Sequence, residues 1–146
     1  MAAVITTRIM EDGPRNAILL INGTEVAADA PAYQTIILPS QLGFVNQATG
    51  SRCASLRVDC IEWDVQAEAN YQVNLFWDAT VPVEFYSCIG RANKYFKNFG
   101  GLYQQPGISG STGGIGINTL NPATTGGATY AWTITLYLVK NGLNPA

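Results

Sequence analysis

The chain has 146 residues, of which 47% are hydrophobic and only 12% are charged, and its formal net charge is −2. This length suits one domain with its own core, and a charged share about half the usual ~25% leaves neutral polar side chains at most exposed positions. The acidic balance argues against a nucleic-acid-binding face, and no apolar run approaches the roughly 18 residues of a membrane span.

The first part of the chain alternates strand patterns with turn residues. Val4–Met10 predicts a strand, and Glu11–Arg15 predicts a turn because it contains Asp-Gly and Pro. Asn16–Asn22 is almost continuously apolar, which favours either a strand covered on both faces or a short arm lying against a neighbour. Asn22-Gly23 predicts a second turn. Tyr33–Leu38 predicts the next strand, and a polar loop with an apolar plug beneath it follows.

Ala54–Trp77 predicts a hairpin at the centre of the protein. Apolar side chains occupy every second position up to Cys60 and shift by one position from Ile61 onward. A parity change inside one strand needs one extra residue, so we expect a β-bulge near Cys60–Ile61. Gln66–Asn70 predicts the turn, and Tyr71–Trp77 predicts the strand that returns beside the first.

The second half of the chain continues the strand pattern. Val81–Ile89 predicts a strand that starts at a sheet edge, because Pro82 cannot donate a ladder hydrogen bond. Arg91–Phe99 favours strand or irregular structure over a short amphipathic helix. Residues 100–116 predict a long glycine-rich loop, and a short strand over Gly114–Leu120 follows.

The last strand pattern is the clearest in the chain. Asn121–Gly127 predicts a turn, and Tyr130–Val139 then alternates large apolar residues with smaller or polar ones. Eight or nine strands with closely spaced turn signals predict an all-β protein: a single, jelly-roll-like β-sandwich domain over residues 1–146, with an N-terminal strand or arm and a glycine-rich loop near 103–116.

The three cysteines predict free thiols. Their number is odd, and Cys53, Cys60 and Cys88 show no CxxC spacing. On one extended segment the first two lie about 23 Å apart at ~3.3 Å per residue, far beyond the reach of a disulfide. The first residues also lack the features of a secretory signal peptide. We therefore expect mostly buried thiols in a reducing cytoplasm.

Little in the chain indicates catalysis. The absence of histidine removes the commonest general base, the serine triad and most metal sites. Glu62 and Asp64 share a strand face about 7 Å apart, and Asp59 and Asp78 approach them if the predicted hairpin pairs. The simpler interpretation is that these acids keep the solvent side of the sheet polar. We expect no enzyme activity, no cofactor and no metal.

The glycine-rich segment Gly107–Gly116 lacks the lysine of a phosphate-binding loop, so we expect a mobile loop that orders against a neighbouring subunit. Arg91, Lys94 and Lys97 are interleaved with aromatic residues. This pattern occurs in single-strand nucleic-acid binders, in rim charges facing an acidic protein partner, and on ordinary solvated faces. The acidic chain favours the last two interpretations.

Tryptophan is the other residue type with an open interpretation. Trp63, Trp77 and Trp132 stack on sugars if they are exposed, but each keeps the period of its apolar neighbours. We expect all three in the core.

Five short stretches follow one another across nearly the whole chain: Arg8–Asn16, Phe76–Val83, Phe99–Leu102, the glycine-rich stretch to Gly116, and Tyr130–Lys140. In this order they resemble small all-β virion proteins of tailed bacteriophages, of the capsid decoration or cement type. The resemblance implies a jelly roll or related sandwich on the outer capsid surface, often a homotrimer, that binds the major capsid protein and stabilises contacts between its subunits.

The resemblance therefore predicts a structural virion protein, without nucleic-acid or membrane partners, assembled in a bacterial cytoplasm. We take Arg8, Arg15, Arg91, Lys94 and Lys97 as candidate partner contacts. A phage tail, neck or head-fibre base protein is the first alternative. A carbohydrate- or receptor-binding module is the second, and it requires exposed tryptophans.

Overall fold

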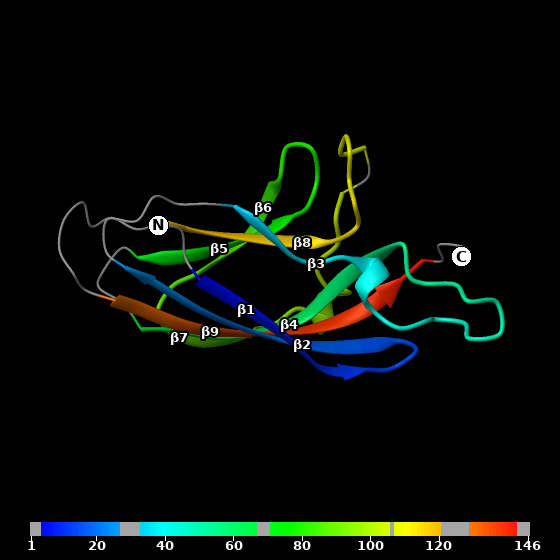
Figure 1. Ribbon diagram of the computed structural model, residues 1–146, viewed down its shortest axis with the longest axis horizontal. Coiled ribbons are helices and arrows are strands. Elements are labelled where there is room, and N and C mark those ends of the chain that lie inside the picture. Colours follow the sequence, from blue (N-terminus) through cyan, green and yellow to red (C-terminus); the bar gives the residue numbers. More distant parts are fainter. Residues whose placement is uncertain (1–3, 27–32, 67–70, 106, 121–128, 143–146) are drawn as a thin grey trace.

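The computed structural model describes residues 4–26, 33–66, 71–105, 107–120 and 129–142 (Figure 1). These residues form nine strands and two short 3-10 helices. The strands are β1 (Val4–Asp12), β2 (Asn16–Val26), β3 (Gln34–Ile37), β4 (Ser55–Gln66), β5 (Gln72–Trp77), β6 (Val83–Cys88), β7 (Arg91–Tyr95), β8 (Ile115–Leu120) and β9 (Thr129–Asn141), and the helices are η1 (Pro39–Gln41) and η2 (Lys97–Phe99).

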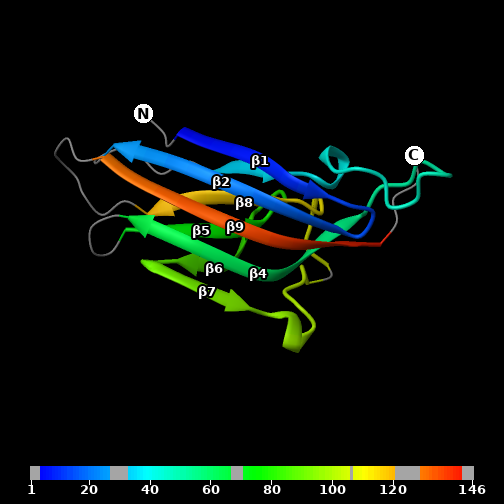
Figure 2. The same cartoon turned by 90° about the horizontal axis from the view of Figure 1, so that it is seen from below.

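The strands form two antiparallel sheets packed face to face (Figures 1 and 2). The larger sheet has the order β1-β2-β9-β4-β7, and the smaller has the order β3-β8-β5-β6. Strands β2 to β9 supply four strands to each sheet in the alternating order of a jelly roll, and β1 is added at one edge. The predicted all-β sandwich of eight or nine strands is confirmed.

Strand β9 lies in the middle of the larger sheet, between β2 and β4. Its inward residues Trp132, Ile134, Leu136 and Leu138 are at most 3% exposed, as the alternation predicts. They belong to one core cluster with inward residues of the smaller sheet such as Leu75. Burying each of these aliphatic side chains contributes roughly 1.5–3 kcal/mol, so this layer supplies much of the stability.

The predicted hairpin over Ala54–Trp77 is wrong. Strand β4 pairs with β9 and β7, whereas β5 pairs with β8 and β6, so the two strands lie in different sheets. The alternation correctly identified an apolar face on each strand. Because those faces pack against each other across the core, β4 and β5 are face-to-face neighbours and not hydrogen-bonded partners.

The expected β-bulge is present in β4, one position before the predicted place. The register with β9 shifts between Val58 and Cys60, which leaves Asp59 as the extra residue. The bulge also divides the other edge of β4. Before it, Val58 exchanges two backbone hydrogen bonds with Leu102, and from Cys60 onward β4 pairs with β7.

The predicted turn at Asn22-Gly23 is also wrong, because both residues lie inside β2. Gly23 faces the core opposite Trp132 in the register of β2 and β9. A Cβ at Gly23 would lie 2.1 Å from the indole ring of Trp132. This glycine therefore makes room for a neighbouring aromatic side chain, which is the second common use of glycine in a strand.

The remaining elements follow the predicted order closely. Strand β6 lies at a sheet edge, as Pro82 indicated. The segment Arg91–Phe99 divides into strand β7 and the 3-10 helix η2. In the loop after η1, Leu42 is buried, Val45 packs against the core and Phe44 is exposed. The predicted turn at 121–127 lies outside the described residues.

We expect Gly23→Ala to lower the free energy of unfolding by about 1–3 kcal/mol, because the added methyl group overpacks the site of Trp132. Urea unfolding followed by tryptophan fluorescence measures this change. Gly13→Ala is the matched control, since a Cβ there would lie at an ordinary 3.6 Å from the Asn16 carbonyl oxygen. Equal stabilities for the two variants would contradict this account of Gly23.

Candidate functional site

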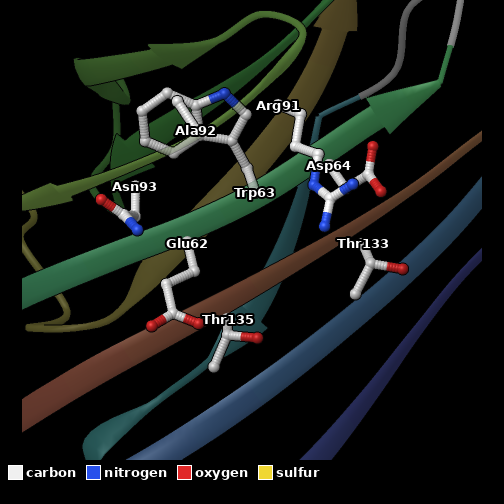
Figure 3. Close-up of a pocket in the computed structure, with 8 residues that line it drawn as sticks. All are labelled: Glu62, Trp63, Asp64, Arg91, Ala92, Asn93, Thr133 and Thr135. Carbon is white, nitrogen blue, oxygen red and sulfur yellow. The ribbon is translucent and has the colours of Figure 1, made fainter.

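The outer face of the larger sheet, on the side away from the smaller sheet, carries Glu62 and Asp64 as predicted. They line a shallow polar groove of about 500 Å³ together with Trp63, Arg91, Ala92, Asn93, Thr133 and Thr135 (Figure 3). Arg91 lies opposite Asp64 in the register of β4 and β7, and Figure 3 shows its guanidinium group beside the Asp64 carboxylate.

Glu62 is also held by a neighbour. The hydroxyl of Tyr137 is hydrogen-bonded to Glu62, and burial followed by the charge of that carboxylate raises the Tyr137 pKa. Asp64 and Glu62 of the polar groove therefore each lie beside another polar side chain of the protein, Arg91 and Tyr137 respectively. The groove has the chemistry of a surface that binds polar groups.

Asp78 does not join Glu62 and Asp64, whereas Asp59 lines a groove of the same outer face together with Glu62. Asp59 is the bulge residue, and its two carboxylate oxygens accept hydrogen bonds of 2.7 and 3.0 Å from Arg57. Asp78 follows β5 in the smaller sheet. The expectation that Asp78 approaches the other acids depended on the wrong hairpin, and it is wrong as well.

Asp78 is 8% exposed, and it is instead the centre of a cluster of hydroxyl groups. Its carboxylate accepts hydrogen bonds from Tyr33 at 2.5 Å, Thr35 at 3.0 Å and Thr112 at 2.6 Å. Burial acts to raise the Asp78 pKa, but the hydrogen bonds from Thr112, Tyr33 and Thr35 outweigh burial and lower it. The cluster joins β3, the end of β5 and the glycine-rich loop.

The same end of the glycine-rich loop is held by backbone hydrogen bonds. Thr112 donates to the Asp78 carbonyl at 3.1 Å, and Thr80 donates to the Ser109 carbonyl at 3.3 Å. The C-terminal part of this loop is therefore fastened to the smaller sheet within the chain itself. The expectation that it orders against a neighbouring subunit stays a prediction.

A second cluster of charged groups joins three other segments. The Lys140 side chain is fully buried, and its Nζ lies 2.5 Å from Asp12 Oδ1 and 3.0 Å from the Gly43 carbonyl. Asp12 in turn accepts a hydrogen bond of 2.8 Å from the Gly43 backbone. These contacts hold β1, the loop after η1 and the end of β9 together.

The five predicted contact cations lie on two opposite edges of the larger sheet. Arg8 is on β1 and Arg15 is in the turn after it, whereas Arg91 and Lys94 are on β7 and Lys97 is in η2. All five are exposed. Four strand spacings of about 4.8 Å separate β1 from β7, so the structure does not bring the five together.

An apolar groove of about 430 Å³ lies on the outer face beside β7, and sequence reasoning missed it. Its side chains include Ile18, Cys60, Tyr95, Tyr137 and Val139 from four neighbouring strands. Three carboxylic residues, Glu11, Asp59 and Glu62, line it as well, together with Lys97. The signal was the near-continuous apolar run of β2, which leaves Ile18 on the outer face.

The thiols and the tryptophans are buried as predicted. Cys53, Cys60 and Cys88 are free. Burial raises the pKa of the Cys88 thiol to about 12, and it is also the main cause that raises the pKa of Cys53 and Cys60. All three thiols are therefore protonated at neutral pH. Trp63, Trp77 and Trp132 are 8%, 4% and 3% exposed.

Among the residues that the structure describes, no three His, Cys, Asp or Glu side chains are grouped so that they could hold a metal ion. In the same ranges, no helix has the length and apolar character needed to cross a membrane.

No family model matches this chain, and comparisons with curated proteins and with solved structures find no match.

We expect Asp78→Asn to lose about 1–3 kcal/mol of stability at pH 7, because three donors lose a charged acceptor. Folding lowers the Asp78 pKa below its ordinary value of 3.8, so its contribution is complete above that pH and is lost as the pH falls through the folded pKa. The difference between wild type and variant should therefore shrink below about pH 4. Urea unfolding at a series of pH values measures it.

Glu84→Gln is the control for this titration, because Glu84 is exposed and accepts a local hydrogen bond from Ser87. A loss in Asp78→Asn that stays constant from pH 7 to pH 3 would contradict the role of the charge. An equal change of stability between pH 7 and pH 3 in Asp78→Asn and Glu84→Gln would also contradict it.

We expect the three thiols of the folded protein to react with Ellman's reagent at pH 8 far more slowly than a free thiol, and all three to react at once in concentrated urea. Burial both shields the sulfur atoms and disfavours the thiolate. Absorbance of the released thiolate counts them. One equivalent that reacts rapidly in the native state would show a reactive cysteine and contradict the structural assignment.

Proposed function

We propose that this protein is a structural virion protein of the capsid decoration type, which binds the major capsid protein on the outer surface of a tailed-phage particle as a homo-oligomer. The proposal starts from the ordered stretches that resemble such proteins. It gives the protein a role in binding through surface area and no role in bond breaking.

The observation that carries the proposal is the uncovered outer face of the larger sheet. No other described element packs on this face (Figure 2). It combines aliphatic and aromatic side chains such as Ile18, Tyr95 and Tyr137 with charges such as Glu62 and Arg91. Protein interfaces have this mixed composition, with apolar contacts inside a polar rim.

The use of charged groups inside the fold supports the same role. Of the eight Lys and Arg residues, the three outside the candidate set have internal partners. Arg57 pairs with Asp59, Lys140 pairs with Asp12, and Arg52 donates to the Leu42 carbonyl and stacks on Phe44. This arrangement leaves Arg8, Arg15, Lys94 and Lys97 as exposed cations for a partner at the two sheet edges, and Arg91, beside Asp64, is exposed as well.

The fold is compatible with the proposal but does not decide it. Jelly rolls occur in viral capsid proteins and in lectins, and one fold hosts many functions. The carbohydrate-binding alternative required exposed tryptophans, and all three are buried. That observation favours the virion role over the lectin role.

The test compares phage particles assembled with and without this gene. We expect hundreds of copies per particle by quantitative mass spectrometry, and we expect particles without the protein to release DNA at a lower temperature. Adding purified protein back should restore the release temperature, because many weak contacts on a lattice add up to stable binding.

A count of about a dozen copies or fewer per particle would contradict the decoration role, because multivalent binding to a lattice needs many copies. Such a count would favour the tail, neck or head-fibre alternative. Absence from purified particles would contradict every virion role.

A further inference from the structure

We propose that two copies of this protein associate through the outer faces of their larger sheets, with Phe99 of each copy inserted into the apolar groove of the other. This inference concerns the contact between copies at the apolar groove, beside residues 137–139 of β9, and it leaves the polar groove beside Thr133 and Thr135 of the same face to a capsid partner. Its test does not depend on the proposed virion role. Four observations on the tip (η2, Lys97–Phe99) and on the apolar groove carry it.

The first observation is the exposure of Phe99. Its side chain is 84% exposed, the highest value among the exposed large hydrophobic residues of the described chain. Burial of a phenylalanine side chain is stabilising, and Phe99 gains little of this stabilisation within its own copy. Aromatic residues that a folded protein holds in solvent are typical anchors of protein interfaces.

The second observation is that the tip is held in a defined shape. The backbone of Phe99 donates to the Phe96 carbonyl at 2.9 Å, and Gly101 donates to the same carbonyl at 2.8 Å. Gly100 and Gly101 adopt φ values of 83° and 86°, which favour glycine. Phe96 itself is buried and packs against Tyr86. A tip fixed in this way loses little entropy on binding.

The third observation is the chemistry of the apolar groove. Ile18, Tyr137 and Val139 give it apolar walls, and its volume of about 430 Å³ accommodates an aromatic ring. Glu11 and Glu62 place carboxylates among these walls. Three carboxylic residues and one lysine, Lys97, line the groove, so it keeps an excess of acidic residues that suits the lysine beside Phe99 on a partner's tip.

The fourth observation is the position of the tip relative to the groove. Lys97 belongs to the tip, and Tyr95 lies two residues before it. Both also line the groove of their own copy. Figure 2 shows η2 at the β7 edge of the outer face. Because tip and groove are neighbours on one face, a single two-fold axis lets two copies exchange their tips, which makes the patch self-complementary.

Sedimentation velocity over a concentration series tests this contact with three proteins: wild type, Phe99→Ser and Val81→Ser. Val81 is the matched control, because it is 75% exposed but precedes β6 of the other sheet. We expect wild type and Val81→Ser to form a dimer, and we expect Phe99→Ser to raise the dissociation constant at least about tenfold, the effect of removing one buried anchor. Matching thermal unfolding curves establish that the variants are folded.

A wild-type protein that stays monomeric at the highest concentration would overturn the proposal. A Phe99→Ser variant that dimerises like wild type would overturn it too, and so would equal weakening by Val81→Ser.

Charge reversal gives an independent test of the groove. Lys97→Glu should weaken the dimer, and adding Glu11→Lys to the same chain should restore part of the lost affinity. No restoration would contradict the placement of the tip in this groove. Since these measurements use the isolated protein and the copy number is counted on particles, failure of the dimer and failure of the virion role are distinguishable.

Discussion

The inward face of β9 is the constraint on which the rest of the structure depends. This strand is covered on both edges by β2 and β4, and its indole and aliphatic side chains are packed against the smaller sheet. Protein interiors are close-packed, so the residues and strands beside β9 must fit the shape of its side chains. Gly23 adapts by having no side chain where the ring of Trp132 lies. The bulge at Asp59 adapts β4 by changing its register within the sheet.

Local alternation was enough to predict which residues face the core. It identified the buried series from Tyr130 to Leu138, and the parity change in β4 revealed the bulge before its position was known. Alternation carries no information on which strand lies alongside. For that reason the pattern predicts a hairpin of β4 and β5 and a turn at Asn22-Gly23, and both predictions are wrong. In both places the deciding contact comes from a strand far away in the sequence.

The candidate sites also divide into features that one strand determines and features that depend on segments distant in the sequence. Glu62 and Asp64 were predicted on one face because two residues of one strand determine that face. The Asp78 cluster was not predictable, because its donors Tyr33 and Thr35 come from one distant segment and Thr112 from another. The apolar groove required the lateral order of β2, β9, β4 and β7. Phe99 belonged to a short amphipathic pattern whose exposed side could not be told from the sequence.

A small number of charged side chains is sufficient to hold the segments of this fold together. Several of the charged groups join segments of the fold to one another: Lys140 with Asp12, Arg57 with Asp59, and Asp78 with three hydroxyl groups. The outer face of the larger sheet is left with a thin distribution of charge and with exposed apolar side chains. A surface of this kind gains from being covered by another protein surface. The central claim is therefore that this face is where the protein makes contact with protein.

Hydroxyl-radical footprinting tests that claim most directly, by comparing the protein in its assembled state with the dilute monomer. The account predicts that Ile18, Tyr95 and Tyr137 are labelled less in the assembled state, while exposed residues of the smaller sheet such as Leu120 keep their reactivity. Protection confined to the smaller sheet, with the larger sheet's outer face labelled equally in both states, would contradict it.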